Sequence, residues 1–232
     1  SSCNIKSQIM FWDFLVSYGK GSLLGGSVVF LSSYLDRTIC NKSMTKIIST
    51  TPTLLLEAYI HSHYNLMLVS PIVYSIVDNT LLSSVLNFSL KDCTQLLFIQ
   101  NIGYFIAHYC MHKNLSLYKY HSFRHKFDSI LIPTIGNAVS TVEFLFAYTA
   151  PFVVGAYYIR PSELSFLASI GIVSIGNMVI HMEEMRGVWW LPGFVSPTNH
   201  IEHHEKRNRH YSAPLINFDW IADTVQDLLT EN

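Results

Sequence analysis

The sequence contains few charged residues for its length. Only 13% of its 232 residues are Asp, Glu, Lys or Arg, whereas about 25% is usual for a soluble domain. Lys and Arg are absent from residues 47–90, 127–159 and 161–185. Such long gaps are typical of membrane-spanning segments, which need about 20 mostly apolar residues per crossing. Charged faces would interrupt an equally apolar soluble core, so the composition predicts a multi-pass membrane protein.

The sequence also lacks the features of several other protein classes. Its four cysteines form no CxxC pair, so neither a zinc ribbon nor a disulfide framework is expected. The cysteines are expected to be buried free thiols. The net charge of −1 gives no electrostatic basis for binding nucleic acid. The absence of an HExxH motif argues against a zinc peptidase. No repeat or low-complexity tract divides the chain, and residues 1–232 are expected to form one domain.

The apolar stretches predict an all-α membrane bundle of about four to five spans. Residues 1–50 are expected to form an interfacial N-terminal segment, a candidate first span and a loop over residues 36–46. Residues 51–232 form the expected core, which carries the histidines. Its predicted spans cover residues 52–77, 93–111, 130–159 and 164–180. The last two are joined by the short turn Arg160-Pro161-Ser162-Glu163, so they are expected to form a helical hairpin.

Eight of the eleven histidines occur in a pattern that predicts a metal site. The eight are His108 and His112, His121 and His125, the single His181, and the triplet His200, His203 and His204. Residues three or four apart share one face of a helix, and converging neutral imidazoles suit a transition metal such as iron, zinc or copper. No catalytic residue is predicted beyond this metal site. The spacing of His61 and His63 points them in different directions on a helix, so packing or channel-lining roles are expected for them.

The histidine-rich segments are expected to gather at one end of the bundle. The hairpin returns the chain to the side on which the third span ends. Eight of the fifteen basic residues also lie in the segments at that end. The positive-inside bias therefore predicts a histidine-rich helical cap that faces the cytosol, or the matrix in a mitochondrial membrane.

This pattern resembles the fatty acid hydroxylase and sterol desaturase superfamily of integral membrane di-iron oxygenases. That superfamily carries HxxxH or HxxxxH, then HxxHH, and a further HxxHH after a helical hairpin. Here the last box reads HIEHH at residues 200–204, and the following NFDWIADT at residues 217–224 continues in the same manner. The similarity covers about residues 50–228, and His181 falls where the family has a further ligand histidine.

The resemblance implies a lipid oxidoreductase with two iron ions held by the eight histidines. Oxygen and electrons from a donor such as cytochrome b5 would support hydroxylation or desaturation of a sterol, fatty acyl chain or sphingolipid. The lipid is expected to enter between spans, against aromatic side chains such as Phe144, Phe146 and Tyr148. The family implies the endoplasmic reticulum membrane, with the mitochondrial inner membrane as the alternative.

One residue departs from the family pattern inside a histidine box. The second box should read HxxHH, but Arg124 stands at the position of the middle histidine. Arginine has only hydrogen-bond donors and cannot ligate a metal, so one iron is expected to lose a ligand. Asn177 and His210 are the candidate compensating ligands. Acceptors for the ring N–H groups of the ligand histidines are expected among the acidic residues Glu183, Glu184, Glu202 and Glu205.

Two interpretations follow from this departure. The first is an active lipid oxygenase with an unusual metal site. The second is a non-catalytic relative with a degenerate site, which serves as a structural or lipid-binding subunit alongside other membrane subunits. Metal occupancy separates them, because a degenerate site should hold one metal ion or none.

Overall fold

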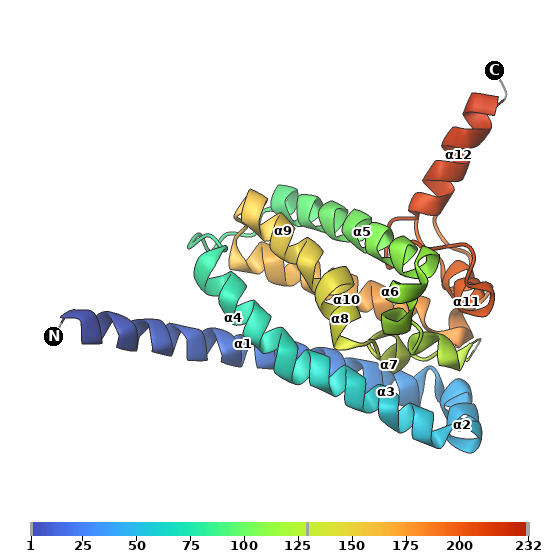
Figure 1. Ribbon diagram of the computed structural model, residues 1–232, viewed down its shortest axis with the longest axis horizontal. Coiled ribbons are helices and arrows are strands. Elements are labelled where there is room, and N and C mark those ends of the chain that lie inside the picture. Colours follow the sequence, from blue (N-terminus) through green and yellow to red (C-terminus); the bar gives the residue numbers. More distant parts are fainter. Residues whose placement is uncertain (1, 129, 231–232) are drawn as a thin grey trace.

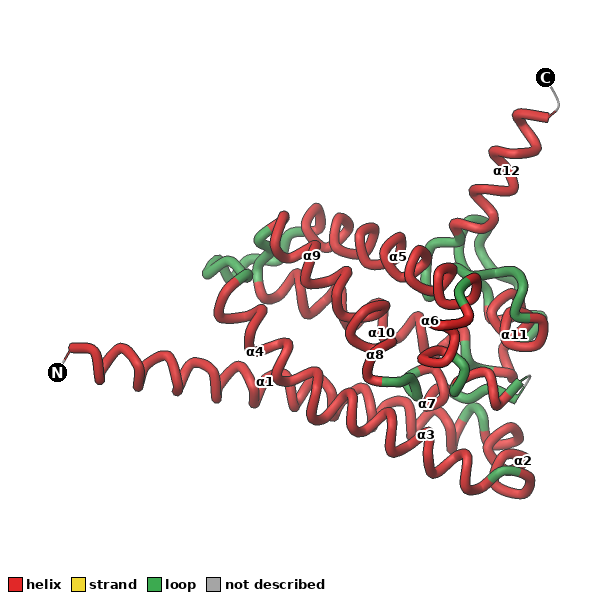
Figure 2. Tube along the Cα trace, viewed as in Figure 1, coloured by secondary structure: helices red, strands yellow, loops and turns green. Residues whose placement is uncertain are grey.

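The protein is built from helices packed lengthwise into a bundle. The computed structural model describes residues 2–128 and 130–230, and within them it contains no strand, only two isolated β-bridges (Figure 2). The elements are, in chain order, α1 (Ser2–Thr38), α2 (Asn41–Thr50), α3 (Pro52–Tyr64), the π-helix η1 (Asn65–Val69), α4 (Ser70–Thr80), α5 (Leu90–Lys113), α6 (Leu115–His121), the 3-10 turn η2 (Arg124–Phe127), α7 (Pro133–Gly136), α8 (Thr141–Glu143), the π-helix η3 (Phe144–Thr149), α9 (Ala150–Ile159), α10 (Glu163–Ile180), the 3-10 turn η4 (Glu183–Met185), α11 (Pro197–Lys206) and α12 (Phe218–Thr230). The prediction of an all-α fold is confirmed.

The long helices lie side by side and the short ones collect at one end. Figure 1 shows α1 along the nearly continuous α3–η1–α4 segment, and α5 beside α9 and α10. Helices α6, α7 and α11 gather at the end of the bundle where α5 and α10 finish, and α12 projects from that end. We call this end the cap. The bundle therefore carries the histidine segments together on one side, as the hairpin topology predicts.

Three helical stretches are long and apolar enough to cross a membrane. They are Phe11–Thr38, Thr141–Ile159 and Glu163–Ile180. Their outward faces carry large exposed apolar side chains, including Leu23, Phe30 and Ile175, as expected of surfaces in contact with lipid. Two further predicted spans, α5 and the α3–α4 segment, are helical but do not reach this apolar length. They contain polar residues within their length, so four to five spans stays a prediction.

The N-terminal part differs from the sequence prediction. The expected N-terminal segment and candidate first span lie on one helix, α1, of 37 residues. The expected loop over residues 36–46 is wrong, because α1 continues to Thr38 and α2 begins at Asn41. Basic residues in this stretch led to the loop prediction, yet Arg37 and Lys42 sit on the exposed faces of these helices. Such faces tolerate charge without ending a helix.

The predicted helical hairpin is confirmed, and local chemistry explains its turn. Helix α9 ends at Ile159, and the next residue, Arg160, adopts a left-handed conformation with φ of 52°. Pro161 follows, and the side chain of Ser162 then caps α10 by accepting a hydrogen bond from the Ser165 backbone N–H at 3.2 Å. Such N-caps satisfy backbone donors that a helix start leaves free. This turn brings α10, and with it His181, back to the cap.

Candidate metal centre

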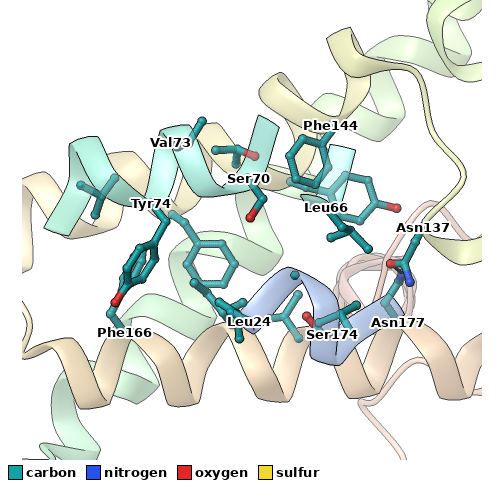
Figure 3. A pocket seen from close by; sticks show the side chains of 18 of the residues that line it. Leu24, Leu66, Ser70, Val73, Tyr74, Asn137, Phe144, Phe166, Ser174 and Asn177 are labelled. Carbon is teal, nitrogen blue, oxygen red and sulfur yellow. Dashed lines mark hydrogen bonds between the residues drawn. The ribbon is translucent and has the colours of Figure 1, made fainter. Parts of the chain in front are cut away.

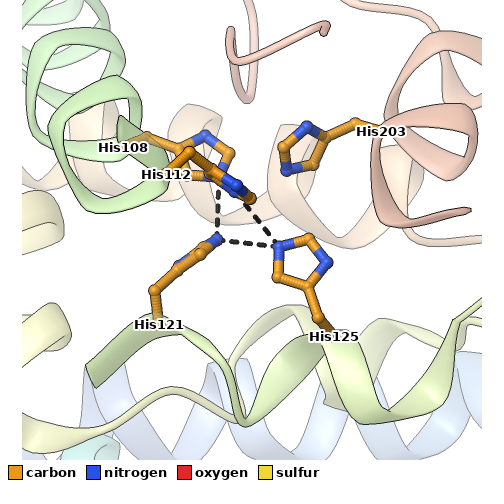
Figure 4. A group of neighbouring side chains, drawn as sticks. All are labelled: His108, His112, His121, His125 and His203. Carbon is orange, nitrogen blue, oxygen red and sulfur yellow. Dashed lines mark hydrogen bonds between the residues drawn. The ribbon is translucent and has the colours of Figure 1, made fainter. Parts of the chain in front are cut away.

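Five histidines from four elements converge in the cap. His108 and His112 come from the last turns of α5, His121 ends α6, His125 lies in η2 and His203 lies in α11. One ring nitrogen from each lies within 4.8 Å of all the others, and Figure 4 shows the five rings facing a common centre. We call these residues the five-histidine group. The i, i+4 spacing of the pair on α5 places both rings on one helix face, as predicted.

Backbone carbonyl groups fix the tautomers of two members of this group. His108 donates from Nδ1 to the carbonyl oxygen of Tyr211 at 2.6 Å. His203 donates from Nδ1 to the carbonyl oxygen of Arg209 at 2.8 Å. A carbonyl oxygen can only accept, so in a neutral ring the proton is on Nδ1 and Nε2 carries a free lone pair. Both Nε2 atoms are therefore available to a metal.

A carboxylate fixes a third member in the same way. His121 donates from Nδ1 to Oε1 of Glu143 at 2.9 Å, so its Nε2 also carries a lone pair. This Nε2 lies 3.0 Å from the Nε2 of His108. Two lone pairs then face each other in a buried site with no proton between them, which is unfavourable unless a cation lies nearby. The donor set and its geometry fit a bound metal ion.

Burial favours the neutral form of two members of this group. The pKa values of His125 and His203 are lowered, because burial disfavours the charged form and neighbouring histidines add to the effect. A neutral imidazole is the form that binds a metal. These two rings can therefore offer a lone pair without first losing a proton.

The other three predicted ligands form a second group beside the first. His181 follows the last residue of α10, and His200 and His204 lie one turn apart on α11. One ring nitrogen from each lies within 4.8 Å of the others. All three are buried, and burial lowers their pKa values. We call these residues the three-histidine group, and with it all eight predicted histidines lie together in the cap.

Arg124 reaches into the three-histidine group. Its side chain is 1% exposed, and its Nη2 donates to the Nε2 of His181 at 2.5 Å. Its Nη1 donates to the hydroxyl groups of Tyr148 at 2.8 Å and Tyr104 at 3.0 Å, and to Oε1 of Glu143 at 3.4 Å. Burial opposes its charge, but the two tyrosines and the glutamate raise the pKa of Arg124 above its ordinary value. The guanidinium is thus a permanent cation.

The two groups differ in how they fit the two metal ions that the sequence predicts. The five-histidine group offers converging lone pairs, and no Lys or Arg side chain of the described residues donates a hydrogen bond to one of its rings. In the three-histidine group, His181 donates from Nδ1 to the Asn177 carbonyl oxygen at 2.6 Å, so its single lone pair at Nε2 is the one that accepts from Arg124. One metal position fits the residues present, and the other does not.

The candidate compensating ligands lie away from a metal position. The Asn177 side-chain amide donates to Asn137 at 3.2 Å, and its role in the site is the carbonyl bond to His181. His210 lies outside both groups and contacts Glu202 at 3.2 Å. His61 packs against the ring of Phe123, in agreement with the packing role expected for it. His63 is exposed and contacts the backbone of its own helix, so it has neither the packing nor the channel-lining role expected for it.

Sequence reasoning missed the residue that holds His121. Acceptors for the ring N–H groups were expected among Glu183, Glu184, Glu202 and Glu205, but none of these contacts a member of either group. Glu143 does, and the other acceptors are backbone carbonyls, which a sequence cannot reveal. A signal for Glu143 was present: it stands in an apolar stretch, where an ionisable residue usually has a partner or a function.

An apolar cavity lies within the bundle next to the three-histidine group. Its volume is about 110 Å³ and it is partly open to the outside, and Figure 3 shows side chains from α1, α4, η3 and α10 around it. Asn137, Asn177 and Tyr148 line it as well, and Tyr148 connects it to Arg124. Of the predicted aromatic wall, Phe144 and Tyr148 line the cavity, whereas Phe146 is 65% exposed on the outer face.

Comparison with known protein families matches residues 93–224 to the family described as fatty acid hydroxylase. This region contains every histidine of both groups, the hairpin and Arg124. A search of curated proteins and a search of solved structures found no match.

Proposed function

The chain belongs to the fatty acid hydroxylase family, and we propose that it is a membrane oxidoreductase that oxidises a lipid at a metal ion held by the five-histidine group. One observation carries the proposal. The lone pairs of His108 and His121 face each other at 3.0 Å in a buried site, and their tautomers are fixed by Tyr211 and Glu143. A bound cation is what makes such an arrangement favourable.

The cavity supports the choice of a lipid as the substrate. Its walls are predominantly apolar, and most of its residues come from the three helical stretches that are long and apolar enough to cross a membrane. Apolar walls with a few polar groups at one place bind and orient apolar ligands. Here the polar groups are Asn137, Asn177 and Tyr148, near the end of α10 that carries His181. A lipid in the cavity would lie with one part beside these groups and its remainder against apolar side chains.

The protein's own residues would bind, orient and exclude water. Iron in the five-histidine group would supply oxidation of an unactivated C–H bond by O2, with electrons from a carrier such as cytochrome b5. His108, His121 and His203 are held in position by their Nδ1 hydrogen bonds, which fix the direction of each lone pair. Sterols, fatty acyl chains and sphingolipids are the substrate classes proposed, with hydroxylation or desaturation as the reaction.

The proposed location is the endoplasmic reticulum membrane, with the cap on the cytosolic side. The basic residues of the cap segments support this orientation through the positive-inside bias. A mitochondrial inner membrane with the cap in the matrix is the alternative, and it follows the same bias.

A second candidate function is favoured by Arg124. Because the guanidinium takes the lone pair of His181, the site differs from one built to hold two adjacent metal ions. A relative that retained the fold and the cavity without catalysis would bind lipid as a subunit of a larger membrane assembly. The cavity is equally suited to this role.

The two functions separate in one experiment. Protein in lipid nanodiscs is supplied with ferrous iron, a cytochrome b5 reducing system and candidate lipids, and the lipids are analysed by mass spectrometry. An oxidoreductase yields lipids that have gained an oxygen atom or lost two hydrogen atoms. His203→Ala, which removes one member of the five-histidine group, should abolish the product, whereas His63→Ala, an exposed histidine outside both groups, should retain it. Lipid binding without any product supports the subunit.

A further inference from the structure

We infer that the guanidinium of Arg124 takes the place of a second metal ion, so that the chain holds one metal ion, in the five-histidine group. This inference rests on the metal-binding part of the proposed function and is independent of which lipid is oxidised. It differs from the two ions that the histidine pattern and the family imply.

The first argument is competition for one lone pair. A metal ion bound to a histidine nitrogen lies about 2.0–2.2 Å from it. Nη2 of Arg124 lies 2.5 Å from Nε2 of His181, in the direction of the lone pair that a metal would use. The other nitrogen of that ring donates to the Asn177 carbonyl oxygen. His181 therefore has no second lone pair to offer, and a metal and the guanidinium exclude each other.

The second argument is that the guanidinium cannot easily withdraw. Nη1 has three oxygen partners, on Tyr104, Tyr148 and Glu143, and the whole side chain is buried. Moving it would leave the Glu143 carboxylate and the two hydroxyls without this donor inside the protein. Removing one partner of a buried charged pair is strongly destabilising, because the other charge stays buried without compensation. Arg124 is thus a built-in part of the site.

The third argument concerns what remains for a second ion. Without His181, the three-histidine group retains His200 and His204. Nδ1 of His200 and both ring nitrogens of His204 have no hydrogen-bond partner in the described chain. Protein metal sites of this kind normally supply at least three ligands. Two imidazoles beside a fixed positive charge form a poor site, because the charge repels a bound cation. Nε2 of His200 lies 3.0 Å from Nε2 of His181, but neither His200 nor His204 donates to a backbone carbonyl or a carboxylate among the residues that the structure describes, in contrast to His108, His121 and His203.

The charge and ligand arrangement thus assigns different roles to the two groups. The five-histidine group holds a metal through rings that are oriented for it. The three-histidine group is bound to an internal cation and forms part of the inner wall next to the cavity, through Tyr148 and Asn177. Chemistry that needs two neighbouring metal ions is not available to this arrangement, and any oxidation would proceed with a single ion.

The test is the number of metal ions per chain. Full-length protein in detergent is loaded anaerobically with ferrous iron, freed of excess by gel filtration, and its iron is determined by elemental mass spectrometry. Zinc is used in parallel as a redox-inactive probe. The expected result for the natural sequence is one ion per chain, lost in His203→Ala and retained in His200→Ala. Two ions per chain in the natural sequence would overturn the inference and leave the proposed oxidoreductase intact.

Variants of Arg124 provide a second, independent test. Arg124→His supplies the missing imidazole and removes the competing charge, so it should raise the content to two ions per chain. Arg124→Lys retains a positive charge and adds no ligand, so it should remain at one. The variant Arg124→His/His200→Ala/His204→Ala should return to one, because only two imidazoles then remain at the second position. Gel filtration and circular dichroism check that each variant is folded.

The outcomes distinguish the failure of this inference from the failure of the proposed function. One ion per chain without any lipid product would leave the inference standing and reject the oxidoreductase in favour of the lipid-binding subunit. No bound metal in folded protein of the natural sequence would reject both. If Arg124→His folds but remains at one ion, Arg124 is not what prevents the second ion from binding, and the inference is rejected.

Discussion

His121 and Arg124 donate to the same oxygen atom. Oε1 of Glu143 accepts from Nδ1 of His121 at 2.9 Å and from Nη1 of Arg124 at 3.4 Å. One carboxylate therefore orients a ring of the five-histidine group and balances the charge of the guanidinium in the other group. The two halves of the cap are linked through this side chain, which comes from the end of a membrane-spanning segment.

Glu143→Gln should weaken both halves. The amide retains the shape but loses the negative charge, which leaves the buried Arg124 without its carboxylate and His121 without its strongest acceptor. We expect the free energy of unfolding to fall by about 3–5 kcal/mol and the metal affinity to fall about 10- to 100-fold. Thermal unfolding in detergent and competition with a chelator measure the two effects. The control is Glu183→Gln, whose carboxylate pairs with Arg186 at the surface. Equal behaviour of the two variants would contradict the linkage.

Metal removal should destabilise the protein of natural sequence. Without a cation, the lone pairs of His108 and His121 remain opposed at 3.0 Å. A ligand present at about 100 times its Kd stabilises the folded state by about 2.7 kcal/mol, so chelation should lower the unfolding temperature and added iron should restore it. His203→Ala is the comparison, because it binds metal weakly before chelation. An unfolding temperature unaffected by chelator in the natural sequence would show that this group has no structural need for a metal.

Gly25→Ala should loosen the contact between α1 and the α3–α4 segment. A Cβ atom at Gly25 would lie 1.9 Å from the backbone oxygen of Leu66, so the two helices would have to move apart. Overpacking of this kind costs about 1–3 kcal/mol. The neighbouring Gly26→Ala is the matched control, since its Cβ would meet only the Met67 side chain at 3.6 Å or more. Thermal unfolding checks the difference, and equal stabilities would show that this close helix approach is not needed.

Filling the cavity should reduce lipid binding. Ser174 on α10 lines the cavity, whereas the next residue, Ile175, is 54% exposed on the outer face. Ser174→Phe should lower the amount of lipid that co-purifies with the protein, because the added ring takes the space of the ligand. Ile175→Phe adds a ring of the same kind outside the cavity and should leave the bound lipid unchanged. Mass spectrometry of lipid extracts measures both. Equal lipid content in the two variants would mean that the cavity does not hold the lipid.

Much of the fold was predictable from periodic and compositional features. The hairpin, the helix that carries His108 and His112, and the helix that carries His200, His203 and His204 all follow from apolar length, turn chemistry and i, i+3, i+4 spacing. The N-terminal boundaries were not predictable, because exposed charges and aromatic residues occur on a continuous helix as readily as at its ends.

The sequence predicted the histidines of the candidate site, and it predicted that Arg124 stands at the position of a missing ligand. All eight histidines lie in the two groups, and the arginine stands where a ligand is missing. The partners of the arginine were not predictable, because Tyr104, Tyr148 and Glu143 come from segments that only the fold brings together. Backbone acceptors such as the Tyr211 carbonyl could not be predicted either, because every residue type has a backbone carbonyl.

The guanidinium of Arg124 is a cation made by translation and attached to the chain by covalent bonds. Unlike an ion, it cannot dissociate on dilution, be extracted by a chelator or run short when the cell is poor in iron. The positive charge beside His181 is therefore present as soon as the chain has folded. Every chain that is synthesised contains this charge, and each chain needs half as much iron as a two-ion centre.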